Sequence, residues 1–350
     1  MQAGIDKSKF TYPLIETEQE LEKIMCEPSD DLANSVSKID GDFIVLGGAG
    51  KMGPTLTKLL KNAIDKSGTK KTVTVVGRNF SDSQTKDFTG ADIKIIKCDL
   101  LNDLDSLPDI KNVVYMAGMK FGTSDNSSTT WALNTFLPGL VAKKYRDSRI
   151  VAFSTGNIYH LTPLEMKGAT EEYLPCPYGE YAQSCLGREK MFEYFSRQYG
   201  TKGTIIRLAY AIDLRYGIIL DVAQKIYSGT PIDLSMGHVN LIWQGDANEQ
   251  TIRSFEICNS PTELLNVTGK EIISIKWLAE QISKYINIEP KFEGKESDTA
   301  LLLNPEKACK LFGNPKVSLD QMIQWISYWI QAGGKILGKP THYEQRNGKF

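Results

Sequence analysis

Short apolar runs that alternate with helical segments constrain the fold of this chain most. The runs are continuous rather than alternating in polarity, and they lie at 43–46, 73–76, 93–96, 113–116, 150–153 and 204–208. Between the first two, Leu56, Leu59, Leu60, Ala63 and Ile64 follow the spacing of one buried helix stripe. Continuous apolar runs between helices indicate parallel strands covered on both faces. The pattern predicts an α/β fold with a Rossmann-type, doubly wound parallel sheet.

After about residue 208 the alternation ends, which predicts a second and smaller unit. Turn-rich segments precede helices expected at about 274–286, 304–311 and 318–332. The expected organisation is an N-terminal helical extension at 1–40, an NAD(P)-binding Rossmann domain at 41–208, a C-terminal α+β substrate lobe at 209–335 with a return strand to the sheet, and a polar tail at 336–350. We expect this tail to lie loosely on the surface.

Composition excludes several classes of function. The net charge is −1, so no global field recruits nucleic acid or an anionic membrane. The six cysteines are scattered and only three histidines are present, so we expect no metal site and a reducing, cytoplasmic compartment. No apolar run approaches the roughly 18 residues of a membrane span, and the first residues lack the apolar core of a signal peptide.

The first predicted strand ends in a glycine-rich turn. Gly47, Gly50 and Gly53 stand three residues apart between that strand and an amphipathic helix. Glycine permits a tight turn and the close approach of a pyrophosphate, while the helix N-terminus supplies N–H donors and a positive dipole. This context predicts a dinucleotide site that also includes Lys51 and Met52, and a plain tight turn is the alternative.

The second predicted strand ends at Arg78, without an acidic residue nearby. An acid at this place binds the ribose 2′-hydroxyl of NAD, whereas an arginine can pair with the 2′-phosphate of NADP. We therefore expect NADP slightly ahead of NAD, with Ser81 assisting. The alternatives are that Arg78 is a solvated loop residue or stacks on the adenine.

Over about residues 42–332 these motifs resemble the extended short-chain dehydrogenase/reductase family, which includes the NAD-dependent epimerases and dehydratases. The glycine spacing matches the fingerprint of that family. The resemblance implies that Asp99, followed by Leu100, binds the adenine. It also implies that Ala117 and Gly118 pass under the cofactor and that Asn134 braces the active site.

The resemblance also locates the catalytic groups. Residues 153–159 resemble the segment that ends the fifth strand, which implies Thr155 as the catalytic threonine. Residues 181–189 resemble the family helix Tyr-x-x-x-Lys-Leu-x-x-Glu, which implies Tyr181 as the acid/base and puts Cys185 in the place of the lysine. Tyr178 is a rival register, and its downstream residues fit less well.

The substrate side departs from the family pattern. The arginine of the motif Arg-Asp-Phe-x-x-Val-x-Asp is absent from residues 239–246, which weakens the case for a nucleotide-diphosphate sugar. The Asp-Glu pair of the dehydratases is absent after Thr155, which disfavours sugar 4,6-dehydration. The residues expected to line the substrate pocket are Lys120, Gly156, Asn157, Arg215, Trp243 and Gln244. A structural salt-bridge corner that includes Asp213, Arg215 and Tyr216 is the alternative.

Cys185 leaves the tyrosine without the cation of the family. A neighbouring positive charge lowers a tyrosine pKa by about one to three units, which a neutral thiol cannot do. Lys120 follows the fourth strand and could reach Tyr181 or the substrate, with an exposed loop lysine as the alternative. Arg188 is less favoured, because it stands about 10 Å along the helix from Tyr181. Cys185 itself is expected to be a small core residue rather than a nucleophile.

Together these features predict an NAD(P)-dependent oxidoreductase or epimerase that acts on a sugar or sugar-derived carbonyl or alcohol. Tyr181 would move the hydroxyl proton, Thr155 would orient the substrate oxygen, and hydride would pass to or from the nicotinamide. By analogy with the family, we also expect the protein to form a homodimer. The other class of function is a cofactor-binding sensor or scaffold without chemistry, which the missing lysine favours.

Overall fold

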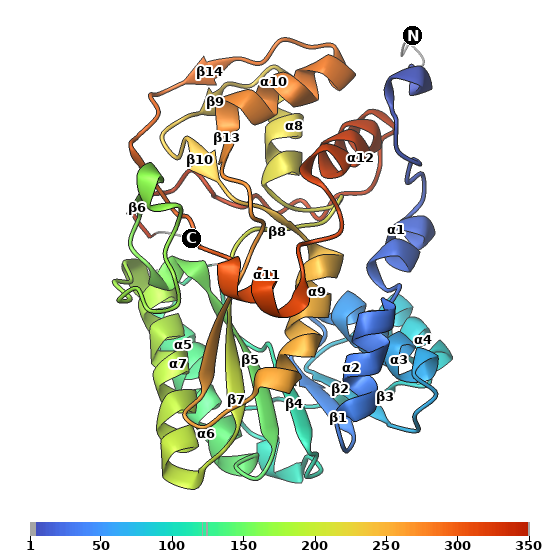
Figure 1. Cartoon of the computed structure of the whole chain (residues 1–350), viewed down its shortest axis with the longest axis vertical. Helices are drawn as coiled ribbons and strands as arrows, with labels where there is room; N and C mark the ends of the chain where they lie inside the picture. Colours follow the sequence, from blue (N-terminus) through green and yellow to red (C-terminus); the bar gives the residue numbers. More distant parts are fainter. Residues whose placement is uncertain (1–4, 121, 124, 349–350) are drawn as a thin grey trace.

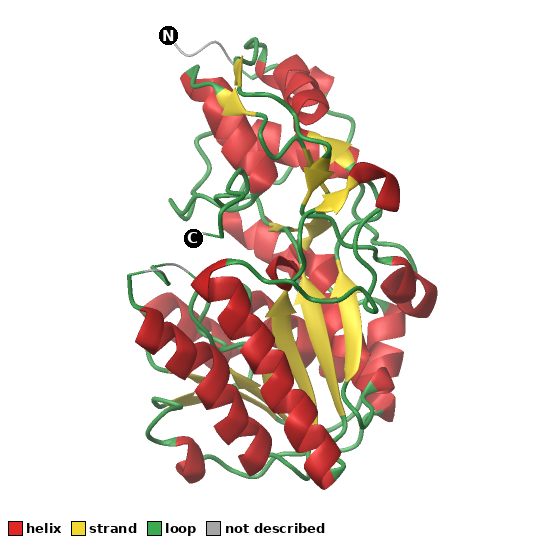
Figure 2. Cartoon of the chain, turned by 90° about the vertical axis from the view of Figure 1, so that its left-hand side faces the viewer, coloured by secondary structure: helices red, strands yellow, loops and turns green. Residues whose placement is uncertain are grey.

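The computed structural model describes residues 5–120, 122–123 and 125–348 and has two stacked parts (Figure 1). The lower part contains the large sheet and most of the N-terminal half of the chain. The upper part is built from helices and short strand pairs of the C-terminal half. Viewed from the side, helices lie on both faces of the strands of the lower part (Figure 2).

The lower part is organised around a sheet of seven parallel strands in the order β12-β7-β5-β4-β1-β2-β3. Their bounds are β1 Phe43–Leu46, β2 Val73–Gly77, β3 Lys94–Lys97, β4 Asn112–Tyr115, β5 Arg149–Thr155, β7 Gly203–Leu208 and β12 Glu263–Val267. All six predicted strands and the return strand are present, so the prediction of a doubly wound sheet is confirmed. The strand order reverses between β1 and β4, which is where such sheets bind ligands.

Successive residues of each strand pack against opposite helix layers. Phe43 and Val45 of β1 join a cluster with Leu56 and Leu60, whereas Ile44 and Leu46 join a cluster with Phe192. The first layer contains α2 Asp30–Lys38, α3 Gly53–Lys66, α4 Asp82–Gly90, α9 Gln244–Arg253 and α11 Glu306–Phe312. The second contains α5 Ser127–Trp131, a π-helical turn Ala132–Phe136, α6 Leu137–Lys144 and α7 Gly179–Tyr199.

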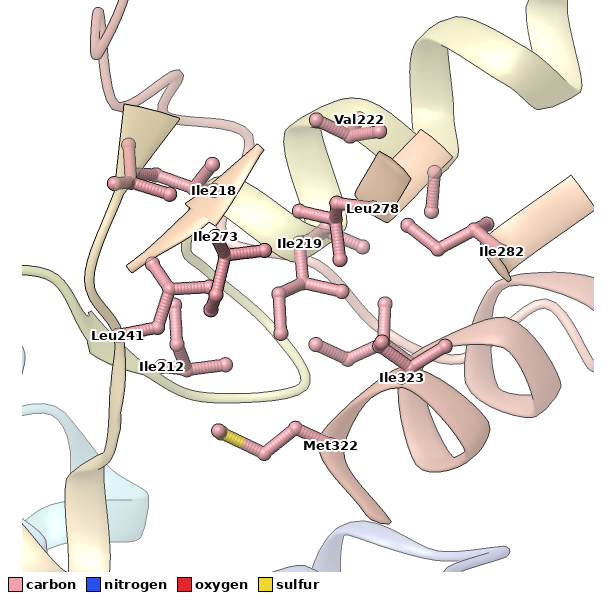
Figure 3. Close-up of a cluster of buried hydrophobic side chains, with 14 of the residues drawn as sticks. Ile212, Ile218, Ile219, Val222, Leu241, Ile273, Leu278, Ile282, Met322 and Ile323 are labelled. Carbon is pink, nitrogen blue, oxygen red and sulfur yellow. The ribbon is translucent and has the colours of Figure 1, made fainter. Parts of the chain in front are cut away.

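The upper part packs three amphipathic helices around one apolar cluster (Figure 3). These helices are α8 Ile218–Ser228, α10 Ile275–Ile286 and α12 Leu319–Gln331. Four short strand pairs complete it, namely β8 Ala211–Ile212 with β11 Ile242–Trp243, β9 Ile232–Asp233 with β14 Phe292–Glu293, β10 His238–Val239 with β13 Ile273–Ser274, and β6 Thr162–Pro163 with β15 Thr299–Ala300. Single 3-10 turns lie at Lys7–Lys9, Leu104–Ser106, Gly156–Ile158, Leu164–Met166 and Ser254–Ile257.

Both terminal segments pack closely onto the molecule. The N-terminal helix α1 (Glu18–Met25) begins with the predicted capping box and buries Leu21 and Met25. The tail does not lie loosely, because Thr341 donates two hydrogen bonds to Asp221 and Tyr343 is buried in the upper cluster. No helix among the described residues is long and apolar enough to span a bilayer.

Candidate active site

A cleft of about 810 Å³ opens at the carboxyl edge of the sheet, between the two parts of the molecule. Its floor is the glycine-rich turn after β1 and the loops after β4 and β5. The start of α7, the segment 208–218, α1 and the tail form its walls. Because the strand order reverses at this edge, the cleft lies where a doubly wound sheet binds its ligands.

The glycine turn fits a pyrophosphate. A Cβ on Gly47, whose φ is +87°, would lie 2.6 Å from the Ala117 nitrogen, and one on Gly53 would lie 2.3 Å from the Gly48 carbonyl oxygen. The Gly50 Cβ position instead meets only one atom within 4 Å, at 3.5 Å, and Gly50 lines the cleft. The first turn of α3 has no side-chain cap, so its N–H groups remain suited to an anion. The residues present therefore fit a dinucleotide.

Lys51 extends from this turn across the cleft. Its Nζ lies 3.9 Å from the centroid of the Tyr216 ring and donates to the Ala211 carbonyl oxygen at 3.3 Å. Burial of the ammonium group lowers the pKa of Lys51 to about 7, and the nearby carboxylate of Asp213 partly opposes this effect. The charge of Lys51 therefore changes near neutral pH, next to the site of an expected anion.

Tyr181 and Thr155 face the same cleft from α7 and from the end of β5. The Thr155 hydroxyl donates to Asn157 Oδ1 at 3.3 Å and accepts from the Asn157 N–H at 3.2 Å. Burial raises the pKa of the Tyr181 hydroxyl, and Cys185 adds to the rise, while Arg188 and a hydrogen bond with Thr155 oppose it. Without a further influence, Tyr181 is thus a protonated phenol at neutral pH.

Cys185 lies behind Tyr181 rather than in the cleft. Its side chain is fully buried against Ile158, Tyr159 and Ala209, and burial raises the pKa of its thiol. A neutral, buried thiol is a poor nucleophile. This environment suits the small core residue that was expected from the sequence.

A buried ion pair fixes α7 against the sheet. Arg207 of β7 and Glu189 of α7 are 2.8 Å apart and nearly inaccessible to solvent. Ser154 donates to the same carboxylate at 2.5 Å, one residue before Thr155. The network holds the helix that carries Tyr181 in a defined position relative to the strand that carries Thr155.

Asn134 braces the loop after β4. Its side chain accepts from the Met119 N–H and donates to the Met119 carbonyl oxygen, both at 2.8 Å, and it also donates to Ser184 of α7 at 3.0 Å. Lys120, the next residue in that loop, lines the cleft, and burial lowers its pKa. Asn134 itself is fully buried, so it shapes the cleft from behind rather than lining it.

Arg188 lies closer to this centre than its distance along the helix suggested. Its Nη2 donates to Asn134 Oδ1 at 2.9 Å and lies 2.3 Å from the position of a Cβ on Gly118, which lines the cleft. The rise of the helix separates the backbones of Tyr181 and Arg188 by about 10 Å, but it does not include the length of the arginine side chain. The long side chain reaches the wall of the cleft at Gly118, and its charge opposes the rise in the pKa of Tyr181.

Three residues predicted on the adenine side lie outside the cleft. Arg78 is exposed at the end of β2. Asp99 accepts a hydrogen bond from the Leu101 N–H at 3.0 Å, and Leu100 is buried in the apolar cluster under the sheet. Ser81 and Gln84, at the start of α4, line the cleft instead.

Three residues predicted on the substrate side are placed differently. Trp243 is buried against Trp325, and the Gln244 side chain donates to Thr55 Oγ1 at 3.0 Å within the core. A Cβ on Gly156 would point at Leu303, away from the cleft. Packing inside the protein, rather than contact with a substrate, therefore accounts for the positions of these three residues. Asn157 and Arg215 do line the cleft.

The terminal segments contribute cleft residues that the motifs did not reveal. Glu18 and Glu22 of α1 lie 3.5 and 4.0 Å from Arg215, which also pairs with Asp213 at 2.9 Å. Lys335 of the tail pairs with Glu18 at 3.2 Å. The four-residue spacing of the two glutamates predicts a shared helix face, but no local pattern predicts that this face meets the cleft.

Comparison with known proteins agrees with this architecture. The model of the NAD dependent epimerase/dehydratase family matches residues 43–230, more than half of the chain. The chain therefore belongs to that family, and its class is that of the NAD-dependent epimerases and dehydrogenases. No curated protein matches the sequence significantly.

Solved structures with the same fold have low sequence identity to this chain. A UDP-glucuronic acid 4-epimerase from Bacillus cereus in complex with NAD superposes with a TM-score of 0.70 at 18% identity, covering 84% of this chain and 100% of that one. A UDP-glucose 4-epimerase from Thermotoga maritima has a TM-score of 0.68 at 17% identity, covering 83% and 99%. A dTDP-glucose 4,6-dehydratase from Bacillus anthracis has a TM-score of 0.68 at 16% identity, covering 83% and 97%.

Proposed function

We propose that this protein epimerises or oxidises a nucleotide-linked sugar by reversible hydride transfer, with Tyr181 as the acid/base. The observation that carries the proposal is that Tyr181 and Thr155 face the same cleft as the glycine turn. Lys51 and Lys120 line the cleft and, when protonated, suit a substrate with phosphate groups. The solved structures with this fold include enzymes of UDP-sugars and a dTDP-sugar.

In this mechanism the chain handles the proton and the position of the substrate. A bound nicotinamide dinucleotide supplies the hydride acceptor or donor. Thr155 and Asn157 orient the reacting hydroxyl or carbonyl oxygen by hydrogen bonds, and Tyr181 exchanges a proton with it. Lys120 is proposed to hold an anionic or hydroxyl group of the substrate from the loop after β4.

For the cofactor we propose NAD, and NADP is the other outcome of the test. The sequence-based preference for NADP depended on Arg78, which lies outside the cleft. Binding of both dinucleotides to the protein and to Arg78→Ala separates the two. A loss of NADP affinity alone in the variant would return the preference to NADP.

We also propose that two copies of the chain associate through the outer face of α5, α6 and α7. The exposed aromatic residues of these segments include Trp131, Phe136, Tyr194 and Tyr199, of which Phe136 is 60% and Tyr194 is 58% exposed. Exposed aromatic residues on adjacent helices are typical of protein interfaces. The occupant proposed here is the same face of a second copy, as in an isologous dimer.

The test incubates the purified protein with NAD and a panel of UDP- and dTDP-sugars, and follows sugar products by NMR and reduced cofactor by absorbance. Turnover of at least one sugar, abolished in Tyr181→Phe, supports the proposal. Tight binding of the dinucleotide without turnover of any sugar would favour a cofactor-binding sensor or scaffold, the function that the replacement of lysine by Cys185 suggests.

A further inference from the structure

Arg188 is a buried cation that the proposed mechanism does not use. Its side chain lies on the same face of α7 as Cys185, three residues away, and only 7% of the residue is exposed. The neighbouring Glu189 is already paired with Arg207. Among the residues that the structure describes, no carboxylate lies within ion-pair distance of the Arg188 guanidinium. In this described part of the chain Arg188 therefore has no carboxylate of its own in direct contact, although Glu189 is near enough to help raise its pKa.

Neutral acceptors hold the guanidinium in place. Nη1 donates to the Phe153 carbonyl oxygen at 2.8 Å, while Nη2 and Nε donate to the side chain and backbone of Asn134 at 2.9 and 3.4 Å. The guanidinium carbon lies 5.8 Å from the centroid of the Tyr115 ring. Carbonyl and amide oxygens satisfy the donors of arginine but leave its full charge. The charge is fixed directly behind Gly118, at the wall of the cleft.

This charge acts on Tyr181, the proposed acid/base, and on Cys185 behind it. Burial is the main reason that the pKa values of Tyr181 and Cys185 are raised, and Arg188 opposes the rise for both. In a poorly hydrated site a fixed unit charge has a larger effect than it would have in water. The titratable side chains that act on Tyr181 are Cys185 and Arg188 of α7. Arg188 is itself influenced by Cys185, Tyr115, Tyr181 and Glu189. Tyr159, Tyr173 and Tyr210 belong to the same cluster as Tyr181, and the same cleft is lined by Lys51, Lys120, Arg215 and Tyr216.

We propose that Arg188 replaces the family lysine as the positive charge that favours the tyrosinate form of Tyr181. This inference rests on the proposed function only in giving Tyr181 the role of acid/base. In the forward step the O–H bond of the substrate breaks and a new O–H bond forms on Tyr181. Arg188 keeps all its protons throughout, since an arginine does not deprotonate in proteins. It acts by charge and position alone and is a positioning residue.

The experiment measures the ionisation of residue 181 without requiring turnover. Difluorotyrosine, whose phenol ionises at lower pH than that of tyrosine, is incorporated at position 181 and titrated by fluorine NMR. The titration is repeated in Arg188→Met, Arg188→Gln and Arg188→Lys. The glutamine variant keeps a donor for the Phe153 carbonyl and lacks the charge, so it serves if the methionine variant does not fold. Arg197→Met is the matched control, because Arg197 lies on the same helix, exposed and paired with Glu193.

The expected result is an upward shift of the probe pKa by about one unit or more in the neutral variants. Arg188→Lys and Arg197→Met should remain close to the unmodified protein. The double variant Cys185→Lys with Arg188→Ala restores the family arrangement and should return the pKa toward that of the unmodified protein. An unchanged pKa in a folded neutral variant would overturn the proposal.

A second measurement separates this proposal from the proposed function. If a sugar is turned over, the acidic limb of the kcat/KM profile should move to higher pH in the neutral variants by a similar amount. Turnover with an unshifted probe would remove the role of Arg188 and leave the proposed function intact. A shifted probe without turnover of any sugar would retain the role of Arg188 and remove the proposed function.

Discussion

At the scale of single residues, the candidate active site shows how burial and charge compete. Removal from water shifts Tyr181, Cys185 and Lys51 toward their neutral forms, because burial always disfavours the charged form. The residues around them decide how far that effect is offset. Motifs identify which side chains take part, but their ionisation depends on neighbours from other segments.

Tyr181→Phe tests the role of the phenol. Phenylalanine keeps the ring packing and removes the proton, so binding of the dinucleotide should be unchanged while kcat falls by about 10²–10⁴-fold. Turnover by steady-state kinetics and cofactor binding by calorimetry measure the two effects. Tyr178→Phe is the matched control, since Tyr178 is 67% exposed and does not line the cleft. Equal losses in both variants would contradict the assignment.

Lys51 predicts a pH dependence of cofactor binding. A lysine is charged below its pKa, and the value for Lys51 is about 7, so its ammonium is mostly present at pH 6 and mostly absent at pH 8. An anionic dinucleotide should therefore bind roughly three- to tenfold more tightly at pH 6 than at pH 8. Calorimetric titrations across this range measure the effect.

Two variants show whether Lys51 causes this pH dependence of cofactor binding. Lys51→Met should bind weakly with little pH dependence, because the charge is absent throughout. Lys51→Arg should keep its affinity at pH 8, because arginine stays protonated. If the affinity still depended on pH in both variants, the effect would belong to another group.

At the scale of elements, α7 joins Tyr181 to the sheet. The Arg207–Glu189 pair and Ser154 connect this helix to β7 and β5 through buried side chains. The tyrosine at one end and the buried pair two turns along thus belong to one rigid unit. The glutamate of the family helix motif is in this way used for structure.

Arg207→Met should be strongly destabilising. It leaves the Glu189 carboxylate buried without its cation, and loss of one partner of a buried pair costs about 3–5 kcal/mol of the free energy of unfolding. Chemical denaturation monitored by circular dichroism measures this change. Arg197→Met removes an exposed pair with Glu193 on the same helix and should cost less than about 0.5 kcal/mol. A similar small cost for both would mean that the buried pair contributes little.

At the scale of the whole molecule, the cleft is completed by both ends of the chain. Glu18 of α1 and Lys335 of the tail form an ion pair at its wall, and Arg215 lies close to Glu18 as well. Neither end belongs to the segment 43–230 that the family model matches. Part of the wall of the cleft is therefore built by segments outside the range that the family model matches.

The proposed homodimer gives a prediction at the same scale. Replacing Phe136 and Tyr194 together by aspartate puts two charges on the outer face of α5 to α7, and it should convert a dimer into a folded monomer. Light scattering coupled to size exclusion measures the mass. Trp277→Asp, an exposed aromatic on α10, is the control that should stay dimeric. A monomeric mass for the unmodified protein would refute the interface.

The sequence by itself determined the alternation of strands and helices, the glycine turn and the helix with Tyr181, because these features depend on interactions between residues a few positions apart. Only the tertiary structure decided that Trp243 and Gln244 belong to the core, that the tail is packed, and that Glu18 lies at the cleft. Those outcomes depend on which surfaces meet after long loops close. The clearest case is Arg188, which backbone spacing disfavoured and which the packing of α7 against Asn134 and Phe153 brings to the active centre.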